Sequence, residues 1–317
     1  MRKSPWIIKV LVAGLLTFLV LSVFSFFYYN VPAREKDDNF VTDYKWPANS
    51  FHSLMTEGFG FGTVNNDGYN NPYDYEENMN IDIVFMGSSH LEGFNVTKDK
   101  NAAVVLSELS DETVYNVGIS EHTLLKCLSN VGEAINKYKP KDYIAIETMT
   151  VSFYDDEIKS ALNREDKLPT YSGGIMNILQ NFKYLKLAYY QYNNLKTNSA
   201  KGSEAITDED LLNELLQKAK NSCGNTKLVI VFHPNIMVDN DGNITTSYSK
   251  QDEQLLSKLC EENDIVYINL EDAFIENYLS ENKLPHGFNN TKMGSGHLNE
   301  TGHFLMAQKI NEVMEGK

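Results

Sequence analysis

The sequence predicts an α/β domain in which helices cover both faces of a parallel sheet, preceded by one apolar segment long enough to cross a membrane. The first observation behind this prediction is that apolar runs of four to six residues alternate with stretches whose apolar residues recur at helical spacing. Strands that alternate with helices pair in parallel, because each connection crosses back over the sheet. The second observation is an uncharged N-terminal run.

That run, Val10–Tyr29, holds twenty residues without a charge, which as a helix span about 30 Å of hydrocarbon. A cleavable signal has a shorter apolar region, so we expect an uncleaved anchor, although Val31-Pro32-Ala33 resembles a cleavage site. Arg2, Lys3 and Lys9 precede the run. The positive-inside rule then predicts a single-pass cell-membrane protein with a cytoplasmic N-terminus, and the remaining chain lies outside the cytoplasm.

Composition excludes several classes of protein. With 42% hydrophobic and 11% aromatic residues among 317, the chain can form a substantial core. Lys and Arg number 28 against 43 Asp and Glu, a net charge of −15 without a basic patch, so we expect no nucleic-acid partner. Cys127, Cys223 and Cys260 are far apart and are interpreted as helix packing residues. We expect neither a metal nor a cofactor.

The chain divides into three parts. Residues 1–30 are predicted to form a cytoplasmic tip and the transmembrane anchor. Residues 31–80 are rich in Asn, Gly, Tyr and Asp without sustained periodicity, which predicts a linker and a loosely folded entry segment. Residues 81–317 form the α/β domain. Its pattern predicts strands at 81–86, 114–117, 143–146, 228–232 and 265–268, and helices at about 99–110, 121–138, 174–197, 208–221, 249–262 and 301–314. For the aromatic-rich helix at 174–197 we expect core packing or a lid over the site, with membrane or partner contact as the alternative.

Polar residues gather where the predicted strands end, which is where parallel sheets bind ligands. The first four strands are followed by Gly87-Ser88-Ser89-His90-Leu91-Glu92-Gly93, Asn116-Val117-Gly118, Glu147-Thr148-Met149-Thr150 and His233-Pro234-Asn235, and Gly296-His297-Leu298-Asn299-Glu300-Thr301-Gly302-His303 leads into the last helix. These segments predict a site at this edge of the sheet.

Three of these segments together resemble the SGNH (GDSL) hydrolase and acyltransferase superfamily. They are Gly-x-Ser-x-x-x-Gly after the first strand, Gly118 after the second, and His-Leu-Asn-x-x-Gly-His beginning at His297. The resemblance covers about residues 81–315. It implies a flavodoxin-like three-layer sandwich whose parallel sheet has about five strands.

The resemblance also implies roles for individual residues. Ser89 is the nucleophile, His297 is its base, and the backbone N–H groups of Ser89 and Gly118 form part of the oxyanion hole. Acyl transfer needs these three functions, and a glycine lets a substrate approach the turn backbone. The alternative interpretation is an ordinary strand-to-helix turn with a serine N-cap at 87–89, and a histidine that merely precedes a capped helix.

The sequence departs from the family at the residue that orients the histidine. The family has an Asp three residues before that histidine, and position 294 here is Gly. We therefore predict a Ser89–His297 dyad, in which Ser295 or a backbone carbonyl holds the other imidazole nitrogen.

A second departure lies after the third strand, where the family's oxyanion Asn is absent. Thr148 is the predicted replacement, with Thr150 as the alternative. His90, His233 and Asn235 are candidate substrate-binding residues, and for His233 a structural role is the equal alternative.

Two functions remain open. The leading prediction is a membrane-anchored extracytoplasmic serine acyltransferase or esterase that acts on acyl groups, expected to be O-acetyl, of cell-surface carbohydrate or cell-wall polymer, beside a membrane-bound O-acyltransferase. The alternative is a non-catalytic SGNH-like subunit that holds polymer or acyl carrier for that partner. The missing Asp and Asn favour the alternative, and the retained Ser89, Gly118 and His297 favour the enzyme. A Ser89 Oγ to His297 Nε2 distance within about 3.5 Å would favour catalysis.

Overall fold

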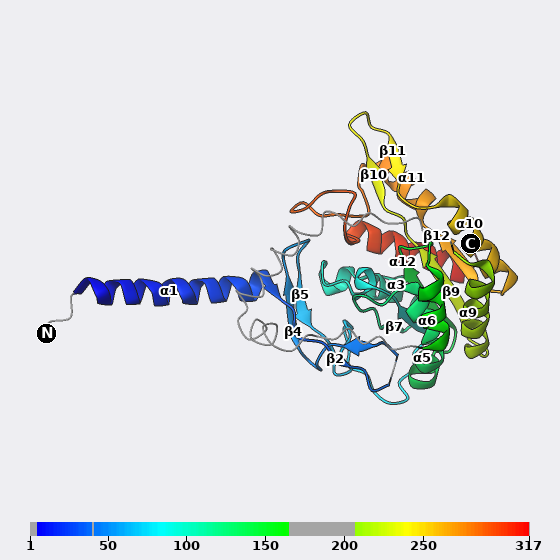
Figure 1. The fold of residues 1–317 in the computed structure, drawn as a ribbon, viewed down its shortest axis with the longest axis horizontal. Coiled ribbons are helices and arrows are strands. Elements are labelled where there is room, and N and C mark those ends of the chain that lie inside the picture. The colour runs from blue at the N-terminus through cyan, green and yellow to red at the C-terminus, as the bar shows by residue number, and fades with distance from the viewer. Residues whose placement is uncertain (1–4, 40, 165–206, 317) are drawn as a thin grey trace.

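A five-stranded parallel sheet forms the centre of the computed structural model, which describes residues 5–39, 41–164 and 207–316. The strands lie in the order β12, β9, β8, β6, β7, of which Figure 1 labels β12, β9 and β7. Their bounds are β6 (Ile83–Met86), β7 (Val114–Asn116), β8 (Tyr143–Thr148), β9 (Lys227–Phe232) and β12 (Val266–Asn269), and all neighbours pair in parallel. If the five strands are numbered by their order in the chain, the sheet read from the β7 edge has the order 2-1-3-4-5, which is the flavodoxin-like order. The predicted sheet is confirmed.

Helices cover both faces of this sheet. Along β6, Val84 and Met86 enter one core cluster, and Ile83 and Phe85 enter the other, as the two-residue period of a strand requires. The first cluster packs against α4 (Leu124–Ser129), α5 (Val131–Tyr138), α6 (Asp155–Asn163), α9 (Glu209–Ser222) and α10 (Lys250–Glu262), and the second against α3 (Ala102–Ser110), α11 (Glu271–Glu281) and α12 (Glu300–Met314). The predicted helix at 121–138 is thus two helices, and the one at 174–197 lies outside the described residues. The three cysteines are buried in the first cluster, which confirms their packing role.

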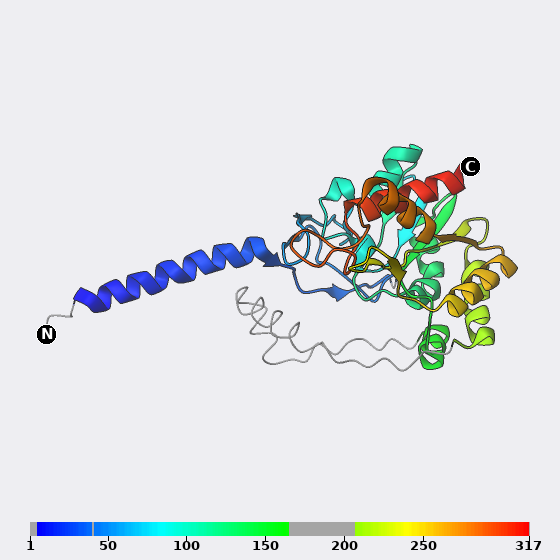
Figure 2. The ribbon, with the colours of Figure 1, turned by 90° about the horizontal axis from the view of Figure 1, so that it is seen from above.

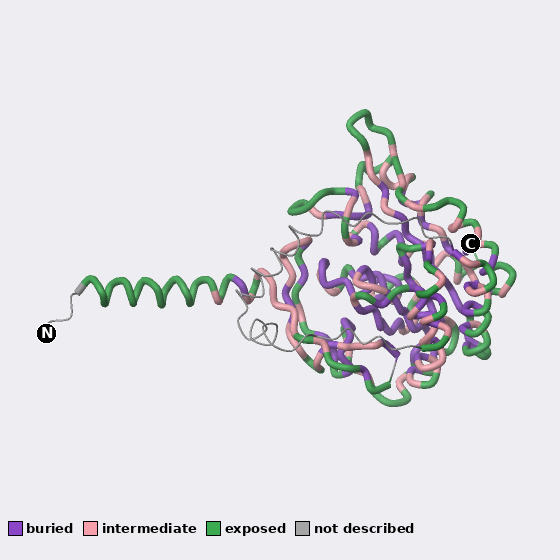
Figure 3. Tube along the Cα trace, in the orientation of Figure 1, coloured by how far each residue is buried: buried purple, intermediate pink, exposed green. Residues whose placement is uncertain are grey.

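The N-terminal helix α1 (Pro5–Tyr28) projects from the domain and is exposed along most of its length (Figures 2 and 3). It is long and apolar enough to cross a membrane. It continues without a linker into β1 (Tyr29–Asn30), which pairs with β4 (Phe51–Leu54), and β4 pairs with β5 (Gly60–Thr63). The small sheet β1, β4, β5 therefore joins the helix to the domain.

The segment 31–80, for which the sequence predicts a linker and loose folding, packs against the α/β domain. It holds β4 and β5 of the small sheet just described and the pair β2 (Glu35–Lys36) and β3 (Tyr44–Lys45). Val41 and Tyr69 are fully buried in the first core cluster. Asp67 accepts hydrogen bonds from Lys137 Nζ (2.6 Å) and Tyr138 Oη (2.7 Å). The polar side chains of the segment form hydrogen bonds with loop backbone and with the surface of the domain. Such contacts leave no periodic pattern in the sequence.

Candidate active site

The serine predicted as nucleophile stands at the carboxyl end of β6, as the first residue of the short helix α2 (Ser89–Glu92). Ser88 caps this helix, its Oγ accepting from the His90 N–H at 3.3 Å. Gly93 ends it in the left-handed conformation, with φ 66°. The turn before it needs a glycine as well, because a Cβ at Gly87 would lie 2.6 Å from Glu147 Oε2. The strand, turn and cap together present the Ser89 side chain at the sheet edge.

The histidine predicted as base reaches this serine from the opposite end of the chain. His297 Nε2 lies 2.9 Å from Ser89 Oγ, within the distance expected for catalysis. The loop before α12 is fixed at both ends, since Gly287 N–H donates to the His297 carbonyl (3.0 Å) and Asn299 caps α12 by accepting from the N–H groups of Thr301 and Gly302. The structure therefore brings the two predicted residues together.

A carboxylate holds the other imidazole nitrogen, so the predicted dyad and its predicted supports, Ser295 or a carbonyl, are wrong. Glu57 Oε2 lies 2.7 Å from His297 Nδ1, and Glu57 Oε1 accepts the backbone N–H of His297 at 2.7 Å. Gly296 leaves room for this carboxylate, because a Cβ there would lie 2.1 Å from Glu57 Oε1. Position 294 offers no such place, since a Cβ at Gly294 would lie 2.8 Å from the Ile236 carbonyl oxygen. The geometry is a Ser–His–Glu triad.

The charges of this pair reinforce each other. Burial by itself would lower the pKa of His297, but the hydrogen bond and the negative charge of Glu57 outweigh burial and raise the pKa above its usual value. Burial would raise the pKa of Glu57, but the hydrogen bond and charge of His297 leave it lowered. The carboxylate is thus ionised at neutral pH, fixes the proton on Nδ1, and leaves the Nε2 lone pair facing Ser89.

Two of the three predicted oxyanion donors are engaged inside the protein. The Gly118 N–H donates to Asn116 Oδ1 at 2.7 Å, and the Thr148 hydroxyl donates to the Thr150 carbonyl at 2.9 Å. The absence of a side chain at Gly118 serves packing, since a Cβ would lie 2.7 Å from the Glu92 backbone nitrogen in α2. The geometry does not give Gly118 and Thr148 the predicted role, and the Ser89 N–H stays a prediction.

A buried glutamate fixes the turn that carries the nucleophile. Glu147, at the end of β8, accepts the Ser88 N–H (2.7 Å) and the Ser88 hydroxyl (2.9 Å). It also pairs with His233 Nε2 at 2.5 Å. Burial would raise the pKa of Glu147, but the hydrogen bond and charge of His233, together with the Ser88 donors, leave it lowered. His233 is fully buried and holds this carboxylate, so the structural alternative holds for it.

The other two candidate substrate-binding residues differ from each other. His90 is buried, and its Nδ1 accepts the Leu298 N–H at 3.1 Å, which ties α2 to the residue after His297. It is a structural residue rather than a substrate contact. Asn235 is half-buried and follows β9 closely, and its side-chain oxygen has no hydrogen-bond partner among the described residues.

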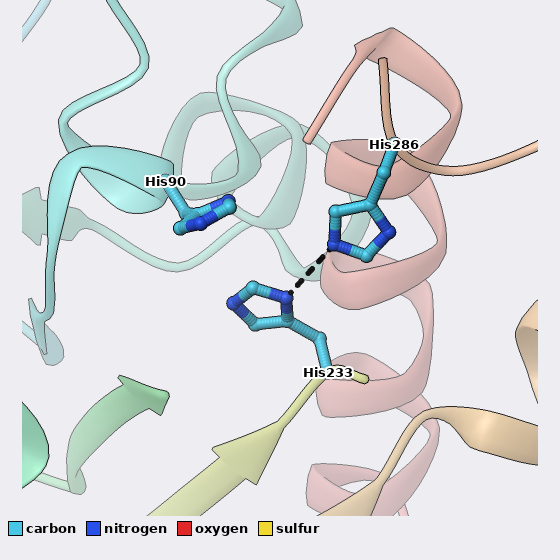
Figure 4. A group of neighbouring side chains, drawn as sticks. All are labelled: His90, His233 and His286. Carbon is cyan, nitrogen blue, oxygen red and sulfur yellow. Dashed lines mark hydrogen bonds between the residues drawn. The ribbon is translucent and has the colours of Figure 1, made fainter. Parts of the chain in front are cut away.

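Three buried histidines lie close together behind the candidate site and have the ligand spacing of a metal site (Figure 4). One of them, His90, lies beside His297, with ring centroids 5.0 Å apart. One ring nitrogen of each of His90, His233 and His286 lies within 4.8 Å of the others, and His233 Nδ1 is 3.3 Å from His286 Nε2. Burial lowers the pKa of His90 and of His286, so both rings are neutral. Because Nδ1 of neutral His90 accepts from Leu298, its proton sits on Nε2, and the ring has no free lone pair for a metal ion. The set does not fit a three-histidine metal centre. His233 and His286 form a hydrogen-bonded network with Glu147, and the His90 ring packs edge-on against both histidines.

Glu147→Gln tests this network. We expect the free energy of unfolding to fall by about 1–3 kcal/mol, because an amide leaves one of the buried donors without an acceptor. We also expect kcat for ester hydrolysis to fall on the order of tenfold or more, since the turn carrying Ser89 shifts. Chemical denaturation and steady-state kinetics measure the two effects. Glu271→Gln is the control. Glu271 is the first residue of α11 and also accepts a side-chain hydrogen bond, from the Tyr248 hydroxyl, but it does not contact the turn that carries Ser89. Unchanged kcat in a destabilised Glu147 variant would limit Glu147 to stability.

Comparisons with known proteins returned solved structures alone, since no protein-family model and no curated protein matches the sequence. A Bacillus subtilis protein is 10% identical, with a TM-score of 0.42, over 81% of this chain and 60% of that one. A two-domain esterase active on acetylated mannans is 13% identical, with a TM-score of 0.40, over 74% and 49%. A member of the lipolytic G-D-S-L family from Veillonella parvula is 15% identical, with a TM-score of 0.39, over 74% and 97%. The chain thus spans about half to three fifths of the first two.

The order of the five strands, with Ser89 after the first of them and His297 before the last helix, decides the architecture. The fold is SGNH-like. Within this SGNH-like domain Glu57 is the residue that sequence reasoning missed. It lies 240 residues from its histidine, in the segment predicted to be a linker. The sequence does place glycines at 58 and 60, directly after Glu57. The structure explains them, because Cβ atoms at Gly58 and Gly60 would lie 2.2 Å and 2.1 Å from backbone oxygens of Asn95 and Phe94. Such closely packed glycines indicate an ordered loop.

Proposed function

We propose that the protein is a membrane-anchored serine esterase or acyltransferase of the SGNH type. We propose the acyl groups of cell-surface carbohydrate or cell-wall polymer as substrate, with O-acetyl as the expected group. The observation that carries the proposal is the continuous array of Glu57, His297 and Ser89, joined at 2.7 and 2.9 Å. A hydroxyl is a poor nucleophile at neutral pH unless a base removes its proton, and this array supplies the base and the group that orients it.

The array performs acyl transfer in two steps. Ser89 Oγ attacks the ester carbonyl while its proton moves to His297 Nε2, and the tetrahedral intermediate collapses as that proton passes to the departing alkoxide. The released alcohol leaves an acyl group on Ser89. In the second step His297 takes a proton from water or from a sugar hydroxyl, whose oxygen attacks the acyl-enzyme, and the proton returns to Ser89 Oγ. Hydrolysis and transfer differ only in that second nucleophile.

The anchor belongs to the proposal because the end of α1 is packed as part of the domain. The Phe26 ring stacks on Phe51 with centroids 5.2 Å apart, and the Met55 N–H donates to the Tyr28 carbonyl at 2.9 Å. Contacts of this kind support a helix that stays attached rather than a signal that is removed. With the N-terminus cytoplasmic, the domain lies outside the membrane, where a polymer acceptor and a membrane-bound O-acyltransferase are its proposed partners.

A binding subunit is the second candidate. The engaged N–H of Gly118 and the engaged hydroxyl of Thr148 favour it, because they leave fewer donors for an oxyanion. Glu57 weighs against it, since a protein that only binds has no use for an oriented base beside a serine.

Reaction with a fluorophosphonate probe separates these candidates. We expect wild-type protein to be labelled covalently at Ser89, because His297 activates its hydroxyl, and Ser89→Ala to remain unlabelled. Ser280→Ala, at an exposed serine of α11, is the matched control, and it keeps Ser89 as a target. Mass spectrometry of the labelled peptide identifies the site. A wild-type protein that neither takes the probe nor hydrolyses a small acetyl ester would favour the binding subunit.

A further inference from the structure

The triad is built next to the end of the proposed membrane helix. β1 begins at the residue after α1 and pairs with β4, with Tyr29 opposite Leu54. The Met55 N–H bonds to the last residue of the helix, Tyr28, at 2.9 Å. Glu57 follows two residues later, so its Cα lies within about 7 Å of the Met55 Cα. The catalytic carboxylate is therefore held close to the point where the chain would leave the bilayer.

A cavity of about 600 Å³ opens on this same side of the domain. One wall is formed by Met55, Gly58 and Phe59, which flank Glu57 in the chain, and the other by Phe288 and Met293 in the loop ahead of α12. Figures 1 and 2 both place that loop, drawn in orange, and the strands β4 and β5 toward α1. The cavity lining includes Gly58 and Asn299, so residues that neighbour Glu57 and His297 in the chain border the cavity.

The two walls are joined by one amide side chain. Asn290 Oδ1 accepts the Gly58 N–H at 2.9 Å, and Asn290 Nδ2 donates to the Met55 carbonyl at 2.9 Å. The segment carrying Glu57 and the loop leading to His297 are consequently fixed to each other as well as to the helix end. The cavity has a defined shape.

Two large apolar side chains that line this cavity, Phe59 and Met293, are exposed, and so is Phe61 beside Phe59. Phe59 and Phe61 are 51% and 53% exposed, with ring centroids 5.5 Å apart, and Met293 is 43% exposed. Each leaves apolar area in water that membrane contact would remove. Exposed aromatic residues beside a membrane span are typical of the bilayer interface. Phe61 lies on β5, which is joined to the helix through β4 and β1.

We propose that the face formed by Phe59, Phe61 and Met293 rests on the membrane surface, and that the cavity receives a membrane-resident amphiphile whose ester reaches Ser89. The inference rests on the proposed function and names the substrate class of that site: an acyl ester on the head group of a lipid-anchored molecule. The anchor of the substrate stays in the bilayer while its head group enters between the two walls. Chemistry at Ser89 then follows the two steps described above.

Two reporters presented to the full chain in phosphatidylglycerol and phosphatidylcholine vesicles test the proposal. One is the soluble acetyl ester of 4-methylumbelliferone, and the other is the same acetyl ester attached to a dialkyl lipid in the vesicle. We expect kcat/KM for the tethered ester to exceed that for the soluble ester at least tenfold. We expect Phe61→Ser to lower the ratio of the two activities at least fivefold, mainly through KM. Leu279→Ser, at a 71% exposed leucine on α11, is the control and should leave the ratio unchanged.

The outcomes separate the inference from the function on which it rests. If the soluble ester is cleaved and the tethered ester is cleaved no better, the inference fails and the esterase stands. If neither ester is cleaved, the proposed function fails, and the inference fails with it. A fall in the ratio for Leu279→Ser as large as for Phe61→Ser would also overturn it.

A measurement without turnover locates the face directly. Tryptophan fluorescence of Phe61→Trp should be quenched by brominated lipids beyond the quenching of wild type, and that of Leu279→Trp should not. Equal quenching of the two variants would show that the face does not contact lipid.

Discussion

Replacement of Ser89 by alanine is expected to lower the turnover of an activated acetyl ester by on the order of 10⁵-fold or more, and His297→Ala should do nearly the same. The reason is that the two residues act as one unit: the serine is inert without the base, and the base has nothing to activate without the serine. The double variant should therefore be little worse than either single variant. Initial rates with the three purified variants measure this.

Folding has to be intact for that comparison to be valid. The Ser89 and His297 side chains are only partly buried, so all three variants should unfold within a few degrees of wild type. Losses that multiply in the double variant would show that the two residues act independently, and the triad assignment would be wrong.

Glu57→Gln should lower kcat by about 10²- to 10⁴-fold, because the amide neither fixes the Nδ1 proton nor supports the imidazolium that forms during attack. The pH dependence should change in a defined direction. In wild type Glu57 raises the pKa of His297, so the base becomes protonated and activity is lost as pH falls through that raised value. Without the carboxylate, burial lowers the pKa of His297, and the acidic limb of the residual activity moves to lower pH.

The profile of kcat/KM against pH for the two proteins measures both effects. Glu76→Gln removes an exposed carboxylate from the same N-terminal segment and should leave rate and profile as in wild type. An acidic limb that stays in place, or moves to higher pH, in the Glu57 variant would contradict the role assigned to this carboxylate.

The sequence predicted the sheet, because apolar runs and helical spacing record burial within neighbouring elements. It also predicted the Ser89 and His297 pair, since each residue sits in a short motif. Glu57 could not be found in this way. Its role depends on a loop whose place is set by backbone contacts with Asn95 and by the Asn290 amide, and neither leaves a periodic pattern.

The oxyanion prediction failed for a related reason. A glycine after the second strand marks a close approach, but the sequence does not say of what. At Gly118 the approaching group is the backbone of α2 rather than a substrate. Likewise Glu147 and His233 belong to separate strand ends, and only the register of β8 with β9 places them side by side.

The long chain separation within the triad has a consequence for biogenesis. The carboxylate and the imidazole come from residues 240 apart, so they meet only after the sheet has formed and the loop ahead of α12 has closed over it. Contacts of such high sequence separation form late, because the entropic cost of closing a long loop arises before the contact contributes any stability. A chain still being synthesised or translocated therefore carries a serine without a base. For the esterase proposed above, we therefore expect no reaction with esters before the chain has folded.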